Sequence, residues 1–165
     1  MELLSDRDLT FIATRFKLPL HNVLQKDRFR QIPNPQLGAY IVNLESSTAG
    51  RGTHWTALVI TERFAVYFDS FGLPIPTAIL RFIYRAPTKL KIIYSTDQIQ
   101  VPDSIFCGWY CLYYIYFMTV LHKNVVDKRY LLNKHNQIYS LENKHLNDKI
   151  LQKLVKSALP RPAKI

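Results

Sequence analysis

The chain has 165 residues, of which 48% are hydrophobic and 21% charged, and this composition argues against disorder over most of its length. A chain this long has room for a hydrophobic core, and we expect a single domain over residues 1–165. The net charge of +10 is uneven, because residues 107–165 carry ten basic and three acidic side chains, which indicates either a polyanion partner or a solvated surface.

A helix and a loop are predicted at the start of the chain. Ser5 is a suitable N-cap for a helix over about residues 5–17, whose apolar residues recur at helical spacing. Residues 21–38 are rich in turn-forming residues, Pro33 and Pro35 among them, and predict a loop.

Strands are predicted in the middle of the chain, with one helix between them. GAYIVNL, from residue 38, has the composition of a strand. THWTALVIT and FAVYFDSFG are β-branched and aromatic runs around Glu62-Arg63, and this pattern predicts a hairpin. TAILRFIYRA, from residue 77, predicts a helix, and LKIIYS, from residue 90, a short strand.

The stretch DSIFCGWYCLYYIYFMTVLH, residues 103–122, has no charged side chain after Asp103. It is at the low end of length for a membrane helix, and its tyrosines are not confined to its ends, so we interpret it as a central buried helix. The basic segment at about 123–165 contains HLNDKILQKLVKSAL, which predicts an amphipathic helix ended by Pro160 and Pro162. Mixed strands and helices favour an α+β fold over an all-parallel sheet.

The two cysteines differ in their predicted surroundings. Cys107 falls near the start of the buried helix, where free N–H groups and the positive end of the helix dipole favour a thiolate. It is the candidate nucleophile, whereas Cys111 lies one turn deeper and is interpreted as a small core residue. The cysteines form no disulfide framework and no zinc spacing, so we expect no metal, a reducing compartment and, without a signal-peptide pattern, no secretion.

A base and its orienting carboxylate are predicted on the hairpin. His54 precedes one strand and Asp69 follows the next, and pairing of the two strands would bring these side chains together. Gly50 and Gly52 would allow a close backbone approach, and Trp55 would wall off the imidazole. Considered alone, His54 also suits a core or edge position, and Asp69 a turn position.

An oxyanion donor is the remaining requirement of a cysteine nucleophile. The side-chain amide of Gln100, seven residues before Cys107, and the backbone N–H of Cys107 are the candidate donors. A glutamine at this spacing carries no meaning without the other residues.

The order His54, Asp69, Gln100, Cys107 resembles that of the adenovirus endoprotease (adenain) family, whose clan includes the SUMO-specific proteases. The matching segments are KDRFRQIP leading into AYIVNL, then GRGTHW, YFDSFG and QVPDSIFCGWYC. The resemblance covers nearly residues 1–122 and is weaker over the basic end of the chain.

This resemblance implies a papain-like fold, in which a central mixed β-sheet packs on a buried helix that carries the nucleophile at its N-terminus. It implies that Cys107 attacks the scissile carbonyl, that His54 is the base and that Asp69 orients His54. Gln100 and the Cys107 amide would form the oxyanion hole, with Trp55 as the aromatic after the histidine. Asp69 stands where adenoviral enzymes carry Glu, and either carboxylate can orient an imidazole.

The resemblance also implies a biological role, namely the processing of precursor polyproteins of a virus or a virus-like element during virion maturation. The expected location is the virion and the host nucleus or a cytoplasmic viral factory, as a monomer without a membrane partner. No cofactor is required by the sequence, but DNA or a viral peptide is expected as a candidate activator. Adenoviral enzymes bind their peptide through a disulfide at a thiol upstream of the nucleophile, and this chain has no cysteine before Cys107.

Two other functions remain open on the sequence. A deubiquitinase or deSUMOylase of the same clan would share the whole catalytic apparatus. A non-enzymatic, basic DNA-binding virion protein would retain the fold but would be favoured only if His54, Gln100 or Cys107 were missing, and none is.

Overall fold

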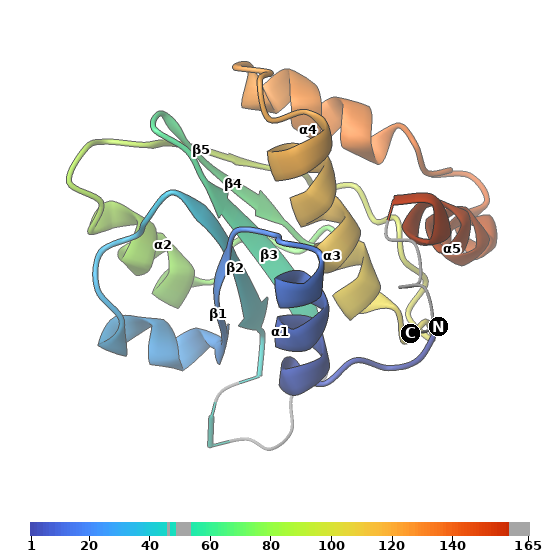
Figure 1. Ribbon diagram of the computed structural model, residues 1–165, viewed down its shortest axis with the longest axis horizontal. Helices are drawn as coiled ribbons and strands as arrows, with labels where there is room; N and C mark the ends of the chain where they lie inside the picture. Colours follow the sequence, from blue (N-terminus) through green and yellow to red (C-terminus); the bar gives the residue numbers. More distant parts are fainter. Residues whose placement is uncertain (46, 49–53, 159–165) are drawn as a thin grey trace.

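A five-stranded sheet forms the centre of the protein in the computed structural model, which describes residues 1–45, 47–48 and 54–158 (Figure 1). The strands run in chain order across the sheet: β1 (Leu20–Gln25), β2 (Gly38–Asn43), β3 (Trp55–Ile60), β4 (Phe64–Phe68) and β5 (Lys91–Tyr94). The two outer pairs are parallel and the two inner pairs antiparallel, so the sheet is mixed. With the surrounding helices, it gives an α+β fold.

Helices cover both faces of the sheet. They are α1 (Asp6–Arg15), α2 (Thr77–Tyr84), α3 (Cys107–Tyr116), α4 (Lys128–Asn136) and α5 (Asn147–Ala158), with short 3-10 segments at Lys26–Gln31 and Lys144–Leu146. Side chains of α1, α3, α4 and α5 share one core with the sheet, and α2 shares a second core on the other face. Figure 1 shows α3 between the sheet and α5.

Helix α3 is the central helix, and a π-helical turn over Phe117–Leu121 extends it. Eight of its ten residues are buried, which matches a segment that is apolar on all sides. Tyr114 is fully buried, stacks on Phe68 with ring centroids 4.7 Å apart and donates its hydroxyl hydrogen to the Val66 carbonyl at 2.9 Å. These contacts fix α3 against β4. In the described ranges, no helix has both the length and the apolar character to cross a membrane.

The predicted first helix is confirmed, with Ser5 as its N-cap. Ser5 Oγ accepts from the backbone N–H of Asp8, and the Asp8 carboxylate accepts from the Ser5 backbone N–H, which is a capping box. The helix ends at Arg15, two residues earlier than predicted, because Lys17 adopts a left-handed φ of 54°.

The strands and the hairpin predicted from GAYIVNL, THWTALVIT, FAVYFDSFG and LKIIYS are confirmed, as is the helix within TAILRFIYRA. The prediction of a loop over 21–38 is wrong, since β1 and a 3-10 segment occupy most of it. Strand β1 is an edge strand paired in parallel with β2, so long-range pairing rather than local composition stabilises it.

The central helix begins at Cys107, which agrees with the predicted place of this cysteine near the helix start. Ser104 N–H donates to the Val101 carbonyl and closes a turn before the helix. Helix α4 was not predicted, and Asp127 caps it by accepting from the backbone N–H of Tyr130. The last predicted helix is present as α5, while Pro160 and Pro162 lie outside the described residues.

Candidate active site

His54 and Asp69 lie side by side at one end of the β3–β4 hairpin. His54 immediately precedes β3 and Asp69 immediately follows β4, and the two strands are antiparallel. The imidazole Nε2 is 2.7 Å from Asp69 Oδ1, and both residues are buried, with 6% and 2% of their surface exposed. An ionised carboxylate can only accept, so Nε2 carries the hydrogen of this contact and Nδ1 points away from Asp69.

Cys107 is the first residue of α3 and is a free cysteine with 3% of its surface exposed. Its N-cap residue, Phe106, provides no side-chain hydrogen bond to the helix terminus. The N–H groups of the first turn therefore keep their capacity to donate to an anion beside Cys107.

The electrostatics of His54 link it to both partners. Burial favours the neutral imidazole, but the hydrogen bond to Asp69 and the interaction with the Cys107 thiol together raise the pKa of His54 to about 9. His54 Nδ1 makes no hydrogen bond among the described residues. Cys107 therefore raises the pKa of His54 through its proximity, without a hydrogen bond to Nδ1. The arrangement can therefore store a proton on the imidazole at neutral pH.

Replacing Cys107 by alanine is expected to lower the pKa of His54 from about 9, because the nearby sulfur, as thiolate, stabilises the imidazolium. NMR titration of the ring nitrogens measures this change. Cys111→Ala is the matched control, since Cys111 is not among the groups that shift His54. An unchanged His54 titration in Cys107→Ala would contradict the pairing.

The raised pKa of His54 also makes the free energy of unfolding depend on pH. Its contribution to the free energy of unfolding is fully present below the unfolded-state pKa of about 6.5 and is lost as pH rises through about 9.

Gln100 is fully buried in the loop that leads from β5 to α3. Its Nε2 donates to the Ser104 carbonyl at 2.8 Å, and its Oε1 accepts from the Ser70 hydroxyl at 2.5 Å. Both contacts fix the amide within the loop that precedes Cys107.

Residues 69–72 form a turn beside the histidine. Asp69 Oδ1 accepts from the Phe71 backbone N–H at 2.7 Å, and the Phe71 ring stacks on the His54 ring with centroids 4.2 Å apart. Gly72 has a φ of 70°, and a Cβ there would lie 2.4 Å from the Thr96 carbonyl oxygen. Only glycine fits this turn without strain.

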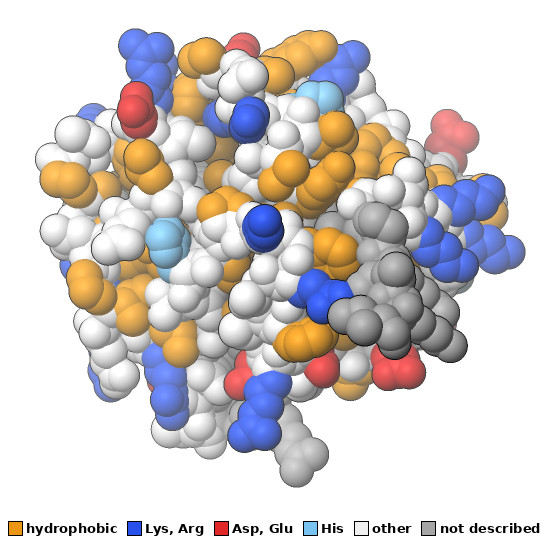
Figure 2. Space-filling model, in the orientation of Figure 1, with side chains coloured by type: hydrophobic (Ala, Val, Ile, Leu, Met, Phe, Trp, Pro, Cys, Tyr) orange, Lys and Arg blue, Asp and Glu red, His pale blue; other side chains and the backbone are white. Residues whose placement is uncertain are grey.

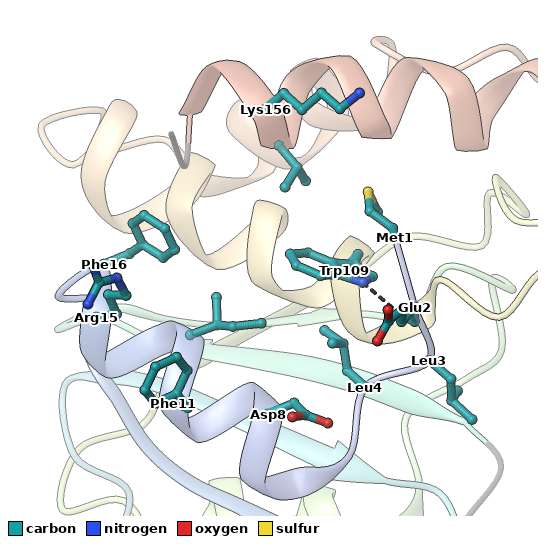
Figure 3. A pocket seen from close by; sticks show the side chains of 12 residues that line it. Met1, Glu2, Leu3, Leu4, Asp8, Phe11, Arg15, Phe16, Trp109 and Lys156 are labelled. Atoms are coloured by element: carbon teal, nitrogen blue, oxygen red, sulfur yellow. Dashed lines mark hydrogen bonds between the residues drawn. The ribbon is translucent and has the colours of Figure 1, made fainter. Parts of the chain in front are cut away.

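The N-terminal segment packs on both tryptophans. Trp55 Nε1 donates to the Leu4 carbonyl at 3.0 Å, and Trp109 Nε1 donates to the Glu2 carbonyl at 2.9 Å (Figure 3). A Cβ on Gly108 would lie 3.2 Å from the Leu4 side chain, so the segment also touches the first turn of α3. This segment, with α1, Trp109 and α5, lines an open groove of about 1170 Å³, which contains none of the predicted site residues.

Helix α5 braces the loop that carries Gln100. Asn147 Nδ2 donates to the Ile99 carbonyl at 2.8 Å, and the Asp148 carboxylate accepts from the Ser104 and Tyr110 hydroxyls, each at 3.0 Å. The loop is therefore held by α5 on one side and by the turn after β4 on the other.

Cys111 has a different environment from Cys107. It is fully buried within α3, and burial raises the pKa of its thiol well above the ordinary value, with the nearby Cys107 and Asp69 adding to the shift. A thiol held in its neutral form in this way suits a core position.

The structure thus brings His54 and Asp69 into contact, places Cys107 within electrostatic reach of His54, and holds Gln100 in the adjacent loop. Gly50 and Gly52 lie outside the described residues. Two residues that contact this site were not singled out from the sequence, namely Ser70 beside Gln100 and Phe71 beside His54. Asp148, which contacts Ser104 in the loop before Cys107, was not singled out either. Within residues 1–45, 47–48 and 54–158, no cluster of three His, Cys, Asp or Glu side chains could hold a metal.

Comparisons with known proteins gave structural matches only. No protein family matches the chain, and no curated protein is significantly similar to it. Similar solved structures include two crystal structures of the ASFV pS273R protease, at 19% and 18% identity and TM-scores of 0.48 and 0.47, each covering 79% of this chain. They cover 64% and 63% of that protease, so this chain spans less than two thirds of its length. The central domain of an uncharacterized protein from Legionella pneumophila is similar over 94% of this chain and 99% of that one, at 14% identity and a TM-score of 0.46.

Proposed function

We propose that the protein is a cysteine peptidase with Cys107 as nucleophile, His54 as base and Asp69 as the residue that orients the base. The observation that carries the proposal is the buried His54–Asp69 contact of 2.7 Å beside a free cysteine at a helix N-terminus. A buried ion pair is costly to maintain, and the raised pKa of His54 shows that its partners favour the imidazolium.

In the proposed reaction, His54 already holds the proton of the thiol as imidazolium, and the Cys107 thiolate attacks the scissile carbonyl carbon. The carbonyl π electrons move to oxygen, and the oxyanion accepts from the Gln100 side chain and the Cys107 backbone N–H. Collapse of this intermediate breaks the C–N bond, and His54 gives its proton to the leaving amine. Water then attacks the thioester, with His54 taking a proton and returning it to the Cys107 sulfur as the acid product leaves.

The finer assignment is an endopeptidase that processes viral precursor polyproteins during virion maturation. Its support is the resemblance of the GRGTHW, YFDSFG and QVPDSIFCGWYC segments to the adenovirus endoprotease family. The same resemblance supports the proposed location, which is the virion and the host nucleus or a cytoplasmic viral factory. We propose that an activating viral peptide would bind this chain noncovalently, since residues 1–106 contain no cysteine.

Incubation with a peptide library made from digested proteins tests the proposal. We expect cleavage inside peptides, often after small residues such as Gly, with none by Cys107→Ala. Ubiquitin and SUMO carrying C-terminal extensions are included in the same assay. Cleavage of those fusions, with the library left intact, would instead establish the deubiquitinase or deSUMOylase alternative.

DNA is the second proposed partner, and a row of lysines on α5 supports it. Lys149, Lys153 and Lys156 are exposed and lie on one face of the helix at helical spacing. Figure 2 shows basic side chains gathered at the right edge of the view, where α5 lies in Figure 1.

Removing all three lysines is expected to weaken DNA binding and to reduce the slope of log affinity against log salt by about 3 units. Fluorescence anisotropy with a labelled DNA duplex over a salt series measures both quantities. A variant with Lys89 and Lys91 replaced, on the chain segment around β5, is the control. Equal loss in the control would contradict a site on α5.

A further inference from the structure

We propose that Ser70 is a positioning residue that holds the Gln100 amide in the one orientation that leaves an N–H for the oxyanion. The inference rests on the proposed function, because the oxyanion role of Gln100 is part of it. Ser70 is fully buried and follows Asp69 directly, so it lies beside the residue that orients the base.

The two contacts of the Gln100 amide determine which end is oxygen. The Ser104 carbonyl can only accept, so the amide atom 2.8 Å from it must be the nitrogen Nε2. The other end is then Oε1, and the Ser70 hydroxyl 2.5 Å away must be the donor. A flipped amide would place oxygen against the Ser104 carbonyl, so the pair of contacts excludes it.

One hydrogen of the Gln100 amide remains available. Nε2 carries two hydrogens, and in the part of the chain that the structure describes it donates only to Ser104. The second N–H is the donor that we assign to the oxyanion. Its direction is fixed because the amide is planar and both of its ends are held.

Ser70 also holds the backbone of the Gln100 loop. Its carbonyl accepts from the N–H groups of Ile99 and Gln100, at 2.9 and 3.0 Å. The adjacent Asp69 holds His54 at 2.7 Å. Two consecutive residues after β4 therefore set the base and the oxyanion donor relative to each other.

Loss of the Ser70 hydroxyl would leave Oε1 of Gln100 buried without a donor and would free the amide to rotate. The contact to the oxyanion exists mainly in the transition state, so kcat is expected to fall about 10-fold while KM changes by less than about twofold.

A double-mutant cycle on peptide turnover tests whether Ser70 acts through Gln100. We expect Gln100→Ala to lower kcat/KM about 100-fold, Ser70→Ala about 10-fold, and the double variant no further than Gln100→Ala. Thr56→Val is the matched control, because it removes another buried hydroxyl, one that contacts the Val42 carbonyl. A further 10-fold loss in the double variant, or the same loss in Thr56→Val, would overturn the proposal.

A readout that needs no activity comes from the Gln100 side-chain NH₂ signals in NMR spectra of the full chain. We expect two separated, slowly exchanging signals in the wild type, which shift together and exchange faster in Ser70→Ala. Unchanged signals would overturn the proposal. If the wild type cleaved nothing, the proposed function would fail, and these signals would still decide whether Ser70 holds Gln100.

Discussion

Replacing Cys107 by alanine is expected to reduce peptide turnover by a factor of about 10⁴ or more while the fold survives, because no other free thiol stands beside His54. The side chain is small and lies at the first residue of α3, so its removal leaves the packing of the helix on β4 intact. Initial rates on a cleaved library peptide and the thermal unfolding midpoint together measure both parts of the prediction.

Cys111→Ala is the matched control in the same helix. It removes an identical thiol one turn away, from a site where burial raises the pKa of the group. We expect turnover within about twofold of the wild type and a loss of stability of about 1 kcal/mol from the small cavity. Full activity in Cys107→Ala, or loss of activity in Cys111→Ala alone, would remove Cys107 from the mechanism.

Acid is expected to destabilise the protein through His135, a residue outside the candidate active site. Its ring is fully buried and surrounded by five aromatic rings, those of Phe68, Tyr113, Tyr114, Phe117 and Tyr139. Burial lowers the pKa of His135 to about 4, against the opposing hydrogen bond between Nδ1 and the Asn136 side chain. The ring is therefore neutral in the folded protein at neutral pH.

The direction of this pH effect follows from the difference in proton binding between the folded and the unfolded chain. The unfolded chain takes up a proton at His135 near pH 6.5 and the folded protein only near 4, so stability falls as pH drops between these values. We expect His135 to contribute a loss of about 2 to 3 kcal/mol in the free energy of unfolding between about pH 7 and 4.5, opposite in sign to the smaller contribution of His54. Urea unfolding at both pH values measures it.

His135→Phe is expected to remove most of this pH dependence, because phenylalanine fits an aromatic site and does not titrate. The exposed His145 provides a control, and His145→Gln should keep the wild-type pH dependence. The carboxyls of Asp8 and Asp27, whose pKa values are lowered by hydrogen bonds from Ser5 and Ser47, titrate below this range. An identical acid loss in His135→Phe and the wild type would contradict the assignment.

The parts of the fold that the sequence predicts are those with strong local signals. Ser5 with Asp8 forms a capping box that starts α1, and the β-branched runs of β3 and β4 flank a short turn. The contact between His54 and Asp69 follows from that hairpin, because antiparallel strands bring the start of one beside the end of the next.

The parts that sequence reasoning missed depend on long-range contacts. Strand β1 has few β-branched residues and forms because β2 pairs with it, while α4 buries Leu131, Leu132 and His135 within an otherwise polar segment. Ser70 contacts Gln100 across 30 positions of the chain, a pairing that no local spacing indicates. The direct neighbour of the His54 ring is Phe71, whereas the role of Trp55 as an active-site wall stays a prediction.

The most direct test of the central claim is the rate of alkylation of the two cysteines by iodoacetamide at neutral pH, mapped by mass spectrometry. Wild type is compared with His54→Ala and with His54→Gln, a second variant that retains a polar side chain beside Asp69. A thiolate–imidazolium pair predicts fast modification confined to Cys107, slowed about 10-fold or more in both variants. Slow modification of Cys107 and Cys111 alike, unaffected by either change at His54, would contradict the proposed cysteine peptidase.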